Sequence, residues 1–452
     1  MITFGRAQLA VLFLCTVGAV RAQDDVTALV ARGVEDLQAT RGVTLAKPPP
    51  VASVTKEQYV EEYVLPSIDF EWGGDFEKMI VLVKALGMVP QDLDAKTFLR
   101  RHATSMTSAA YDFLTKRILF PGTPMERAAL LHELMHASQD ERHDLKALMG
   151  AAAGNLDETL ARGALVEGEA LNVQLRFEMG PPRALAGVTP YGTLREQARD
   201  YFETLNRRVA DWLPDVPPAV LRAQAFVYEE GVLFVERLRR REHNWAAVDA
   251  AYKNPPRSTA QILHPEKYLA GEWPMTLDVR NAEKFFPPDY ALVAENTLGE
   301  FGMRLFLMSH GSDAADAAKA FEGWRGDRVL LYRSSAKKAD IIVWVSMWED
   351  PARAAAAAKT LEQAFGRART WARGPDVTLI VGGDFPAMPD FRVIRRPSAE
   401  GRPLVTTQIL GAVDSCASRQ GRGDRSPALQ RGVREGGAGP VFSLVVSPRG
   451  GD

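Results

Sequence analysis

The stretch His132-Glu133-Leu134-Met135-His136 carries the most specific pattern in this 452-residue chain. Two histidines four residues apart fall on one face of a helix, one turn above the other. Their imidazoles can bind a single metal ion together, and the glutamate beside them can take a proton from a water molecule. The pattern therefore predicts a helix and a candidate metal site. The alternative is a pair of hydrogen-bonded histidines on a core-facing helix.

The residues before the motif predict where its helix begins. Thr123 is a suitable N-cap, Pro124 suits the first helical position, and Glu126 follows Thr123 by three residues. We therefore expect a capped helix that starts at Pro124 and runs through both histidines.

A second helical stretch, Leu156 to Met179, contains the candidate third ligand. Glu167 and Glu169 point to different sides of a helix, so only one of them can reach the metal. A carboxylate in an apolar stretch is costly unless it is paired or ligated. Gly168 is expected to let this helix approach the motif helix closely. The alternative is that both glutamates are solvated or salt-bridged.

An HExxH motif followed by a glutamate on a second helix resembles the gluzincin arrangement of zinc metallopeptidases. The resemblance implies a zincin-like fold, a Zn²⁺ cofactor held by His132, His136 and Glu167, and Glu133 as general base. In thermolysin-like enzymes an aspartate follows the ligand glutamate by four residues, but Leu171 stands there in this chain. The groups that orient the ligand histidines must come from elsewhere, and the candidates are Asp140, Asp157 and Asn172.

The chain is more closely similar to uncharacterised secreted bacterial proteins with this HExxH motif. They share a Gln-Asp pair after the second histidine, here Gln139 and Asp140, and an Ala-Leu-Val-Glu-Gly-Glu-Ala string at residues 164–170. They also share the string Leu-His-Pro-Glu-Lys-Tyr at residues 263–268. This resemblance covers roughly residues 80–310 and implies an exported bacterial protein.

Two residues are candidates for stabilising the oxyanion of a hydrolytic reaction. Tyr228, in the string Tyr-Glu-Glu-Gly, resembles a tyrosine that faces the metal in related gluzincins, and His264 lies in a proline-flanked loop. The alternatives are a core tyrosine and a packing histidine. Upstream of the motif, residues 109–112 and 116–120 predict a hairpin or an edge strand, which in such enzymes holds extended peptide.

The N-terminus reads as a secretory signal. Arg6 provides a positive charge, Leu9 to Val20 is an apolar segment too short to span a bilayer, and Ala22 offers a cleavage site before Gln23. The alternative is an uncleaved apolar anchor. We expect a secreted or periplasmic protein with no membrane span after signal cleavage. Net charge is −2, so the balance of charge gives no case for binding nucleic acid.

Composition and periodicity divide the chain into five parts and predict an α+β fold. A mainly helical zincin-like catalytic domain with a small edge sheet precedes a smaller α+β domain. The latter is expected to have helices at residues 314–324 and 351–365 and strands at residues 329–332, 341–348 and 377–381. The expected parts are a signal peptide (1–22), a helix and Pro-rich linker (23–55), the zincin-like domain (56–286), the α+β domain (289–395) and a disordered Gly/Arg-rich tail (396–452).

These features predict a secreted or periplasmic zinc-dependent peptidase that acts on a peptide or protein substrate. Glu133 is expected to act as general base towards a metal-activated water. The sequence offers no acidic cluster for a substrate N-terminus, which favours an endopeptidase. The first alternative is a zinc-stabilised, non-catalytic envelope binding protein. The second is an exported helical scaffold in which the motif arose by chance.

Overall fold

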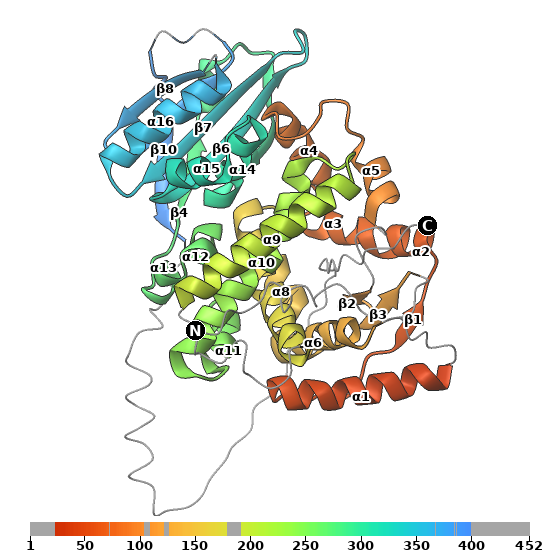
Figure 1. Cartoon of the computed structure of the whole chain (residues 1–452). Coiled ribbons are helices and arrows are strands. Elements are labelled where there is room, and N and C mark those ends of the chain that lie inside the picture. The colour runs from red at the N-terminus through yellow and green to blue at the C-terminus, as the bar shows by residue number, and fades with distance from the viewer. Residues whose placement is uncertain are drawn as a thin grey trace, which may run out of the picture.

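The computed structural model describes residues 23–71, 73–103, 109–121, 126–178, 191–366, 368–383, 385 and 387–398. A helical N-terminal region is followed by a sheet-rich C-terminal part, so the predicted mixture of α and β structure is confirmed (Figure 1). The expected signal peptide and the chain after Ser398 lie outside the described residues. No helix in the described ranges combines the length and apolarity needed to cross a membrane.

The helical region follows the sequence-based expectation from its first helix to the short helices around residue 265. Its elements are α1 (Gln23–Arg41), β1 (Val51–Ser53), α2 (Lys56–Gln58), the π-helical turn η2 (Tyr59–Val64), α3 (Leu65–Glu71), α4 (Phe76–Ala85), α5 (Ala95–His102), β2 (Ala110–Asp112), β3 (Arg117–Phe120), α6 (Arg127–His143), α7 (Leu145–Gly150), α8 (Leu156–Glu178), α9 (Tyr191–Trp212), α10 (Pro218–Glu242), α11 (Ala246–Lys253), α12 (Thr259–Leu263) and α13 (Pro265–Leu269).

The sheet-rich part contains the two helices and three strands that the sequence predicted, together with elements that it did not. Its elements are β4 (Met275–Arg280), the 3₁₀ turn η4 (Ala282–Phe285), β5 (Tyr290–Asn296), α14 (Gly299–Ser309), α15 (Ala314–Phe321), β6 (Trp324–Ser334), β7 (Asp340–Trp348), α16 (Pro351–Phe365), β8 (Ala368–Arg373), β9 (Asp376–Val381) and β10 (Arg392–Pro397).

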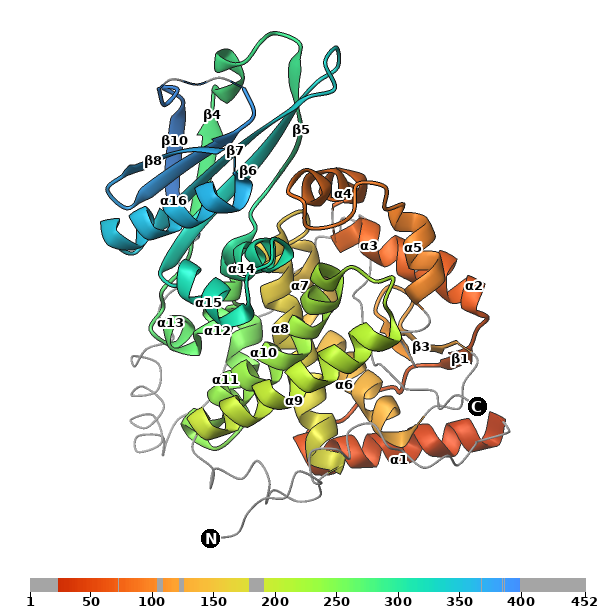
Figure 2. The same ribbon diagram turned by 45° about the horizontal axis from the view of Figure 1, so that its top comes forward.

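Both faces of the five-stranded sheet are buried. Its strand order is β5-β6-β7-β9-β8, and every neighbouring pair is antiparallel. In β7, Ile342 and Trp344 pack with α14–α16, whereas Ile341, Val343 and Val345 pack with the β4–β10 pair. This alternation follows from the two-residue period of a strand. Figure 2 shows the sheet between its helices and the β4–β10 pair.

The helix that carries the motif begins later than the sequence predicted. The structure starts α6 at Arg127 with Glu126 as N-cap, and that side chain makes no capping hydrogen bond. A helix running on from Pro124 is wrong, because the backbone of Glu126 is extended, and the expected cap Thr123 and Pro124 themselves lie outside the described residues. The helix is held instead by burial, since every residue from Ala128 to Asp140 is buried.

The hairpin prediction upstream of α6 is confirmed. Strands β2 and β3 pair antiparallel, and β1 joins β3 in parallel on its other side. The order β1-β3-β2 leaves β2 at the edge of this small sheet. Residues Ala110–Asp112 are buried.

Gly168 permits a close helix crossing, but with a different partner from the one expected. A Cβ at Gly168 would lie 2.2 Å from the carbonyl carbon and oxygen of Gly231 in α10. A Cβ at Gly231 would in turn lie 2.4 Å from the carbonyl oxygen of Ala164 in α8. The expectation that Gly168 brings α8 against the motif helix is wrong. The two glycines fix the contact of α8 with α10.

We expect Gly168→Ala to destabilise the protein by about 1–3 kcal/mol, because the new methyl group has to push two helix backbones apart. Gly163→Ala is the matched control in the same helix. Its Cβ would meet only Val227 Cγ1 at 3.4 Å, an ordinary contact, so the gain in helix propensity of about 0.5–1 kcal/mol should dominate. Urea unfolding of both variants checks this, and equal midpoints would contradict the close crossing.

Two buried aspartates hold the turn that joins the helical region to α14. Asp157 accepts a hydrogen bond from the backbone N–H of Thr259 at 2.7 Å. Asp327 accepts from the N–H groups of Leu298 at 3.1 Å and Gly299 at 2.9 Å. Gly299 has φ +72°, and a Cβ there would lie 1.8 Å from Asp157 Oδ1. The two carboxyl groups therefore lie on either side of this turn.

This junction predicts a specific pH dependence of stability. Burial raises the pKa of Asp157 to about 7 and that of Asp327 to about 6, against about 3.9 in an unfolded chain. The folded state thus binds these protons more tightly, so the stability they contribute is present below about pH 4 and is lost as the pH rises through about 6–7.

Asp327→Asn removes one of these titrations and provides the test. The free energy of unfolding of the wild type relative to Asp327→Asn should fall between about pH 4 and pH 6 and then stay level. Denaturant melts of both proteins at a series of pH values measure this difference. A relative stability that rises over that range would contradict the assignment.

Candidate metal centre

The structure brings His132, His136 and Glu167 together at the contact of α6 with α8. Their ligand atoms all lie within 4.8 Å of one another, and all three residues are buried, with exposed fractions of 0%, 3% and 1%. The two histidines lie one turn apart on α6, and Glu167 faces them from the middle of α8. Glu169 points to the other side of α8, where it pairs with Arg41.

The chemistry of this cluster fits a bound cation. Glu167 Oε2 lies 3.1 Å from His132 Nε2 and 3.4 Å from His136 Nε2. Two ligands of one tetrahedral zinc ion, each about 2.0–2.1 Å from it, lie about 3.4 Å apart. His136 Nε2 and Glu167 Oε1 are buried with no hydrogen-bond partner among the described residues. Such orphaned atoms in a native core call for an explanation, and a shared metal ion provides one.

Charge and burial act on these groups in opposite directions. Burial favours a neutral Glu167, but the positive charge of His136 and the hydrogen bond with His132 lower its pKa to about 2. Burial also disfavours a charged His136, but the carboxylate of Glu167 raises its pKa to about 9. The cluster therefore attracts positive charge, whether as protons or as a metal ion.

Glu133 lies beside the cluster and against the edge strand β2. Its Oε2 accepts a hydrogen bond from the backbone N–H of Tyr111 at 2.6 Å, and its side chain is fully buried. Burial raises the pKa of Glu133, although the two histidines partly offset this effect. Glu133, the expected general base, thus contacts β2, the strand that is expected from the resemblance to hold peptide.

The histidine partner is Gln139, not one of the three residues proposed from the sequence. Gln139 Oε1 lies 2.8 Å from His136 Nδ1. Asp140 instead binds Tyr111 and a lysine of the β2–β3 hairpin, Asp157 binds Thr259, and Asn172 binds an arginine of its own helix. These three assignments are wrong. His132 Nδ1 is buried with no hydrogen-bond partner in the described ranges.

Of the two candidates for oxyanion stabilisation, the structure brings Tyr228 to the cluster. The ring centroids of Tyr228 and His132 lie 6.4 Å apart, and Tyr228 projects from α10, which packs on α8. His264 instead directs Nε2 to Glu300 Oε1 at 2.8 Å, at the contact of α12 with α14. No described contact of His264 reaches the metal cluster, and its hydrogen bond with Glu300 joins the helical region to the sheet-rich part.

Tyr63 is a nearby polar residue that sequence reasoning did not single out. It is fully buried in the π-helical turn η2, and such turns are frequent at functional sites. Burial raises its pKa well above the usual value, and Tyr59, Glu133 and Glu167 add to this shift. Tyr63 therefore lies within the electrostatic reach of the cluster.

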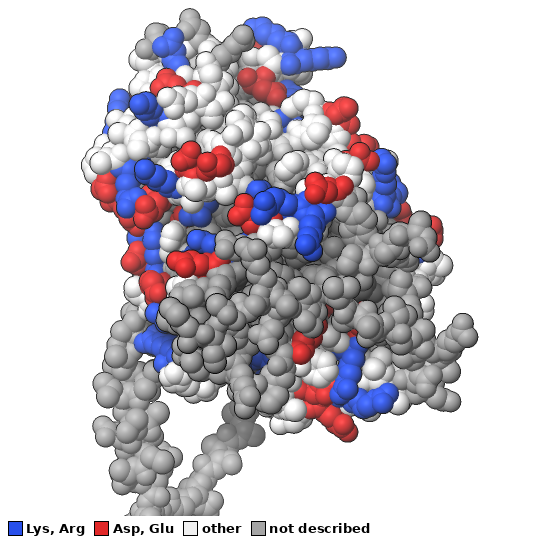
Figure 3. Space-filling view, viewed as in Figure 1, with Lys and Arg blue, Asp and Glu red and all other residues white. Residues whose placement is uncertain are grey.

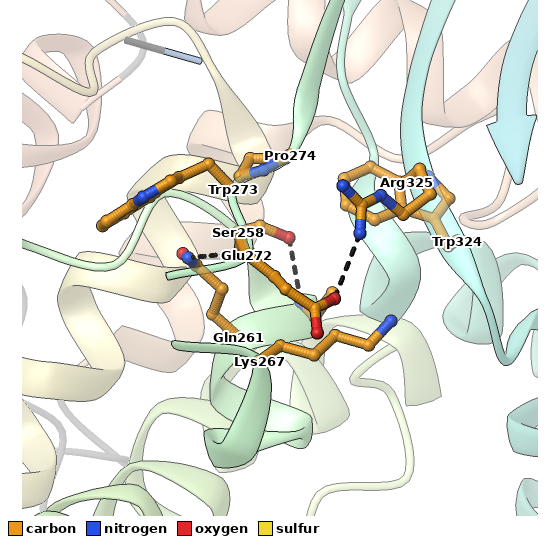
Figure 4. Close-up of a pocket in the computed structure, with 9 residues that line it drawn as sticks. Ser258, Gln261, Lys267, Glu272, Trp273, Pro274, Trp324 and Arg325 are labelled. Carbon is orange, nitrogen blue, oxygen red and sulfur yellow. Dashed lines mark hydrogen bonds and ion pairs between the residues drawn. The ribbon is translucent and has the colours of Figure 1, made fainter. Parts of the chain in front are cut away.

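The pocket in Figure 4 lies away from this cluster, since none of its lining residues belongs to it. The pocket in Figure 4 has a volume of about 10 Å³ and is lined by Trp273, Trp324 and the ion pair of Arg325 with Glu272 at 3.1 Å. That is about the room one water molecule needs.

Basic and acidic side chains are interspersed over the sheet-rich part on the face seen in Figure 3.

Comparison with known proteins covers only the sheet-rich part. Residues 289–405 match a family model described as a domain of unknown function (DUF8575). The match begins one residue before β5 and leaves α6 and α8, with the candidate metal centre, outside it. No curated protein and no solved structure matches the chain.

Proposed function

We propose that this protein is a secreted or periplasmic zinc-dependent endopeptidase with a zincin-like catalytic region of the gluzincin type. The observation that carries the proposal is the buried convergence of His132, His136 and Glu167 with Glu133 beside them. A purely structural zinc site has no use for a base at that position. Structural sites also take four protein ligands, whereas the described residues supply three.

Each group has an assigned role in this proposal. His132, His136 and Glu167 hold Zn²⁺, which when bound lowers the pKa of a water and polarises the scissile carbonyl. The Glu133 carboxylate takes the proton of the attacking water and delivers it to the leaving amine. Tyr228 is the candidate donor to the oxyanion. His264, which pairs with Glu300, has no part in the reaction.

The edge strand β2 supports a peptide as the substrate. It is the outermost strand of its sheet, and the backbone N–H of Tyr111 reaches Glu133. An extended peptide added along such an edge pairs with the strand through its main chain. Its scissile bond then passes beside the Glu133 carboxylate. The expected export signal at residues 1–22 supports the proposed location.

Metal analysis combined with peptide cleavage tests the proposal. The purified protein is expected to contain one zinc ion per chain and to cleave members of a peptide library. A chelator should stop cleavage, and added zinc should restore it. Protein without stoichiometric zinc would sink the proposal. Bound zinc without any cleavage would favour the zinc-stabilised, non-catalytic binding protein.

A further inference from the structure

The side-chain amide of Gln139 is held in one orientation by its surroundings. Its Nε2 lies 2.9 Å from the carbonyl oxygen of Val166, 3.0 Å from Glu169 Oε2 and 2.8 Å from the hydroxyl oxygen of Tyr252, so its two N–H groups are shared among three acceptors. A carbonyl oxygen can only accept a hydrogen bond. The Tyr252 hydroxyl gives its own proton to Glu169 Oε2 at 2.6 Å. The nitrogen of the amide must therefore face these three acceptors.

This orientation decides which nitrogen of His136 carries a proton. With Nε2 of Gln139 engaged, its Oε1 is the atom that faces His136 Nδ1 at 2.8 Å. Because Oε1 is only an acceptor, the imidazole must donate from Nδ1. The lone pair of the neutral ring then lies on Nε2, which points towards Glu167.

The positive charge that holds this arrangement is the guanidinium of Arg41, at the C-terminal end of α1. Glu169 is fully buried, and its Oε1 pairs with Arg41 at 2.7 Å, while Arg142 is more distant at 3.7 Å. Arg41 is the last residue of α1, and its guanidinium also stacks over the Trp245 ring at 4.3 Å. The docking of α1 thus places the Arg41 guanidinium against Glu169, and Glu169 in turn holds Gln139.

We infer that Gln139 is a positioning residue of the metal centre, and that Arg41, Glu169 and Tyr252 fix it so that His136 always presents Nε2 to the metal. This inference rests on the proposed zinc site. Groups that orient a ligand histidine typically change metal affinity 10–100-fold when they are removed. Among the described residues, His132 Nδ1 has no corresponding partner.

Zinc affinity of a Gln139→Leu variant tests the inference. Competition with a chromophoric chelator should give a dissociation constant about 10–100-fold higher than that of the wild type. Gln261→Leu is the matched control. It removes an equally buried glutamine that binds the Glu272 carbonyl and the Arg257 N–H, so it should leave zinc affinity unchanged. Equal affinities for Gln139→Leu and wild type would overturn the inference while the proposed zinc site stands.

A measurement on the wild type makes the test independent of variant folding. In zinc-loaded protein labelled with ¹⁵N-histidine, NMR should find the His136 proton on Nδ1, protected from exchange with solvent. A proton on His136 Nε2 would overturn the inference even if zinc is bound. Wild-type protein that binds no zinc would instead defeat the proposed function, and this inference with it.

Discussion

A Glu133→Gln variant is expected to retain zinc and to cleave peptides about 10²–10⁴-fold more slowly than the wild type, the usual cost of losing a general base. The amide matches the carboxylate in shape, and its oxygen can still accept the Tyr111 N–H bond that Glu133 Oε2 receives at 2.6 Å. It cannot take a proton from water. The loss should therefore appear in kcat, with zinc content unchanged.

Glu141→Gln is the control for this variant, because it is the same substitution on the same helix. Glu141 is exposed near the end of α6 and accepts the N–H of Ala46 at 3.1–3.2 Å. We expect its activity and zinc content to match the wild type. Full peptidase activity in Glu133→Gln would remove Glu133 from the mechanism and would leave the metal cluster without a catalytic assignment.

The parts of the candidate site that follow from helix periodicity could be predicted from sequence. Four-residue spacing puts His132 and His136 on one face of α6, and two-residue spacing separates Glu167 from Glu169 on α8. These relations depend only on the geometry of a single helix. The position of α8 was also predictable, because its apolar pattern is long and continuous.

The parts that depend on contacts between distant segments could not be predicted. Gly168 predicts a close approach, but its partner Gly231 lies 63 residues further along the chain, on α10. Similarly, β4 was not predicted, and it pairs along its whole length with β10, which lies more than 100 residues later in the chain. A local sequence pattern predicts that a surface is buried, but it does not predict which distant segment packs against that surface.

The hydrogen-bond partner of His136 could be predicted only in part. Gln139 follows His136 by three residues, so helix geometry alone allows their side chains to meet. Nothing in the local pattern favours Gln139 over Asp140, however, because the preference comes from Glu169, Tyr252 and the Val166 carbonyl on other helices. Those groups bind the Gln139 amide, whereas Asp140 binds Tyr111 and Lys116 of the β2–β3 hairpin.

The anchoring role of Arg41 leads to the largest expected effect on stability. We expect Arg41→Met to lower the free energy of unfolding by about 3–5 kcal/mol, the usual cost of breaking a buried ion pair from one side. Glu169 has no exposed surface, and the nearest other guanidinium, that of Arg142, is 3.7 Å away. Removing Arg41 therefore leaves a buried carboxylate with the longer ion pair to Arg142 as its remaining described counter-charge.

Arg127→Met separates this effect from a general weakening of α1. Arg127 also ties α6 to α1, through Asp36 at 2.7 Å, but its side chain is 49% exposed, so its loss should cost less than about 1 kcal/mol. If an uncompensated carboxylate is the cause, the double variant Arg41→Met/Glu169→Gln should recover part of the stability lost in Arg41→Met. Urea unfolding of the three variants measures these differences. Equal losses for Arg41→Met and Arg127→Met would show that α1 is held by its apolar face, and that the buried charge pair contributes little to its docking.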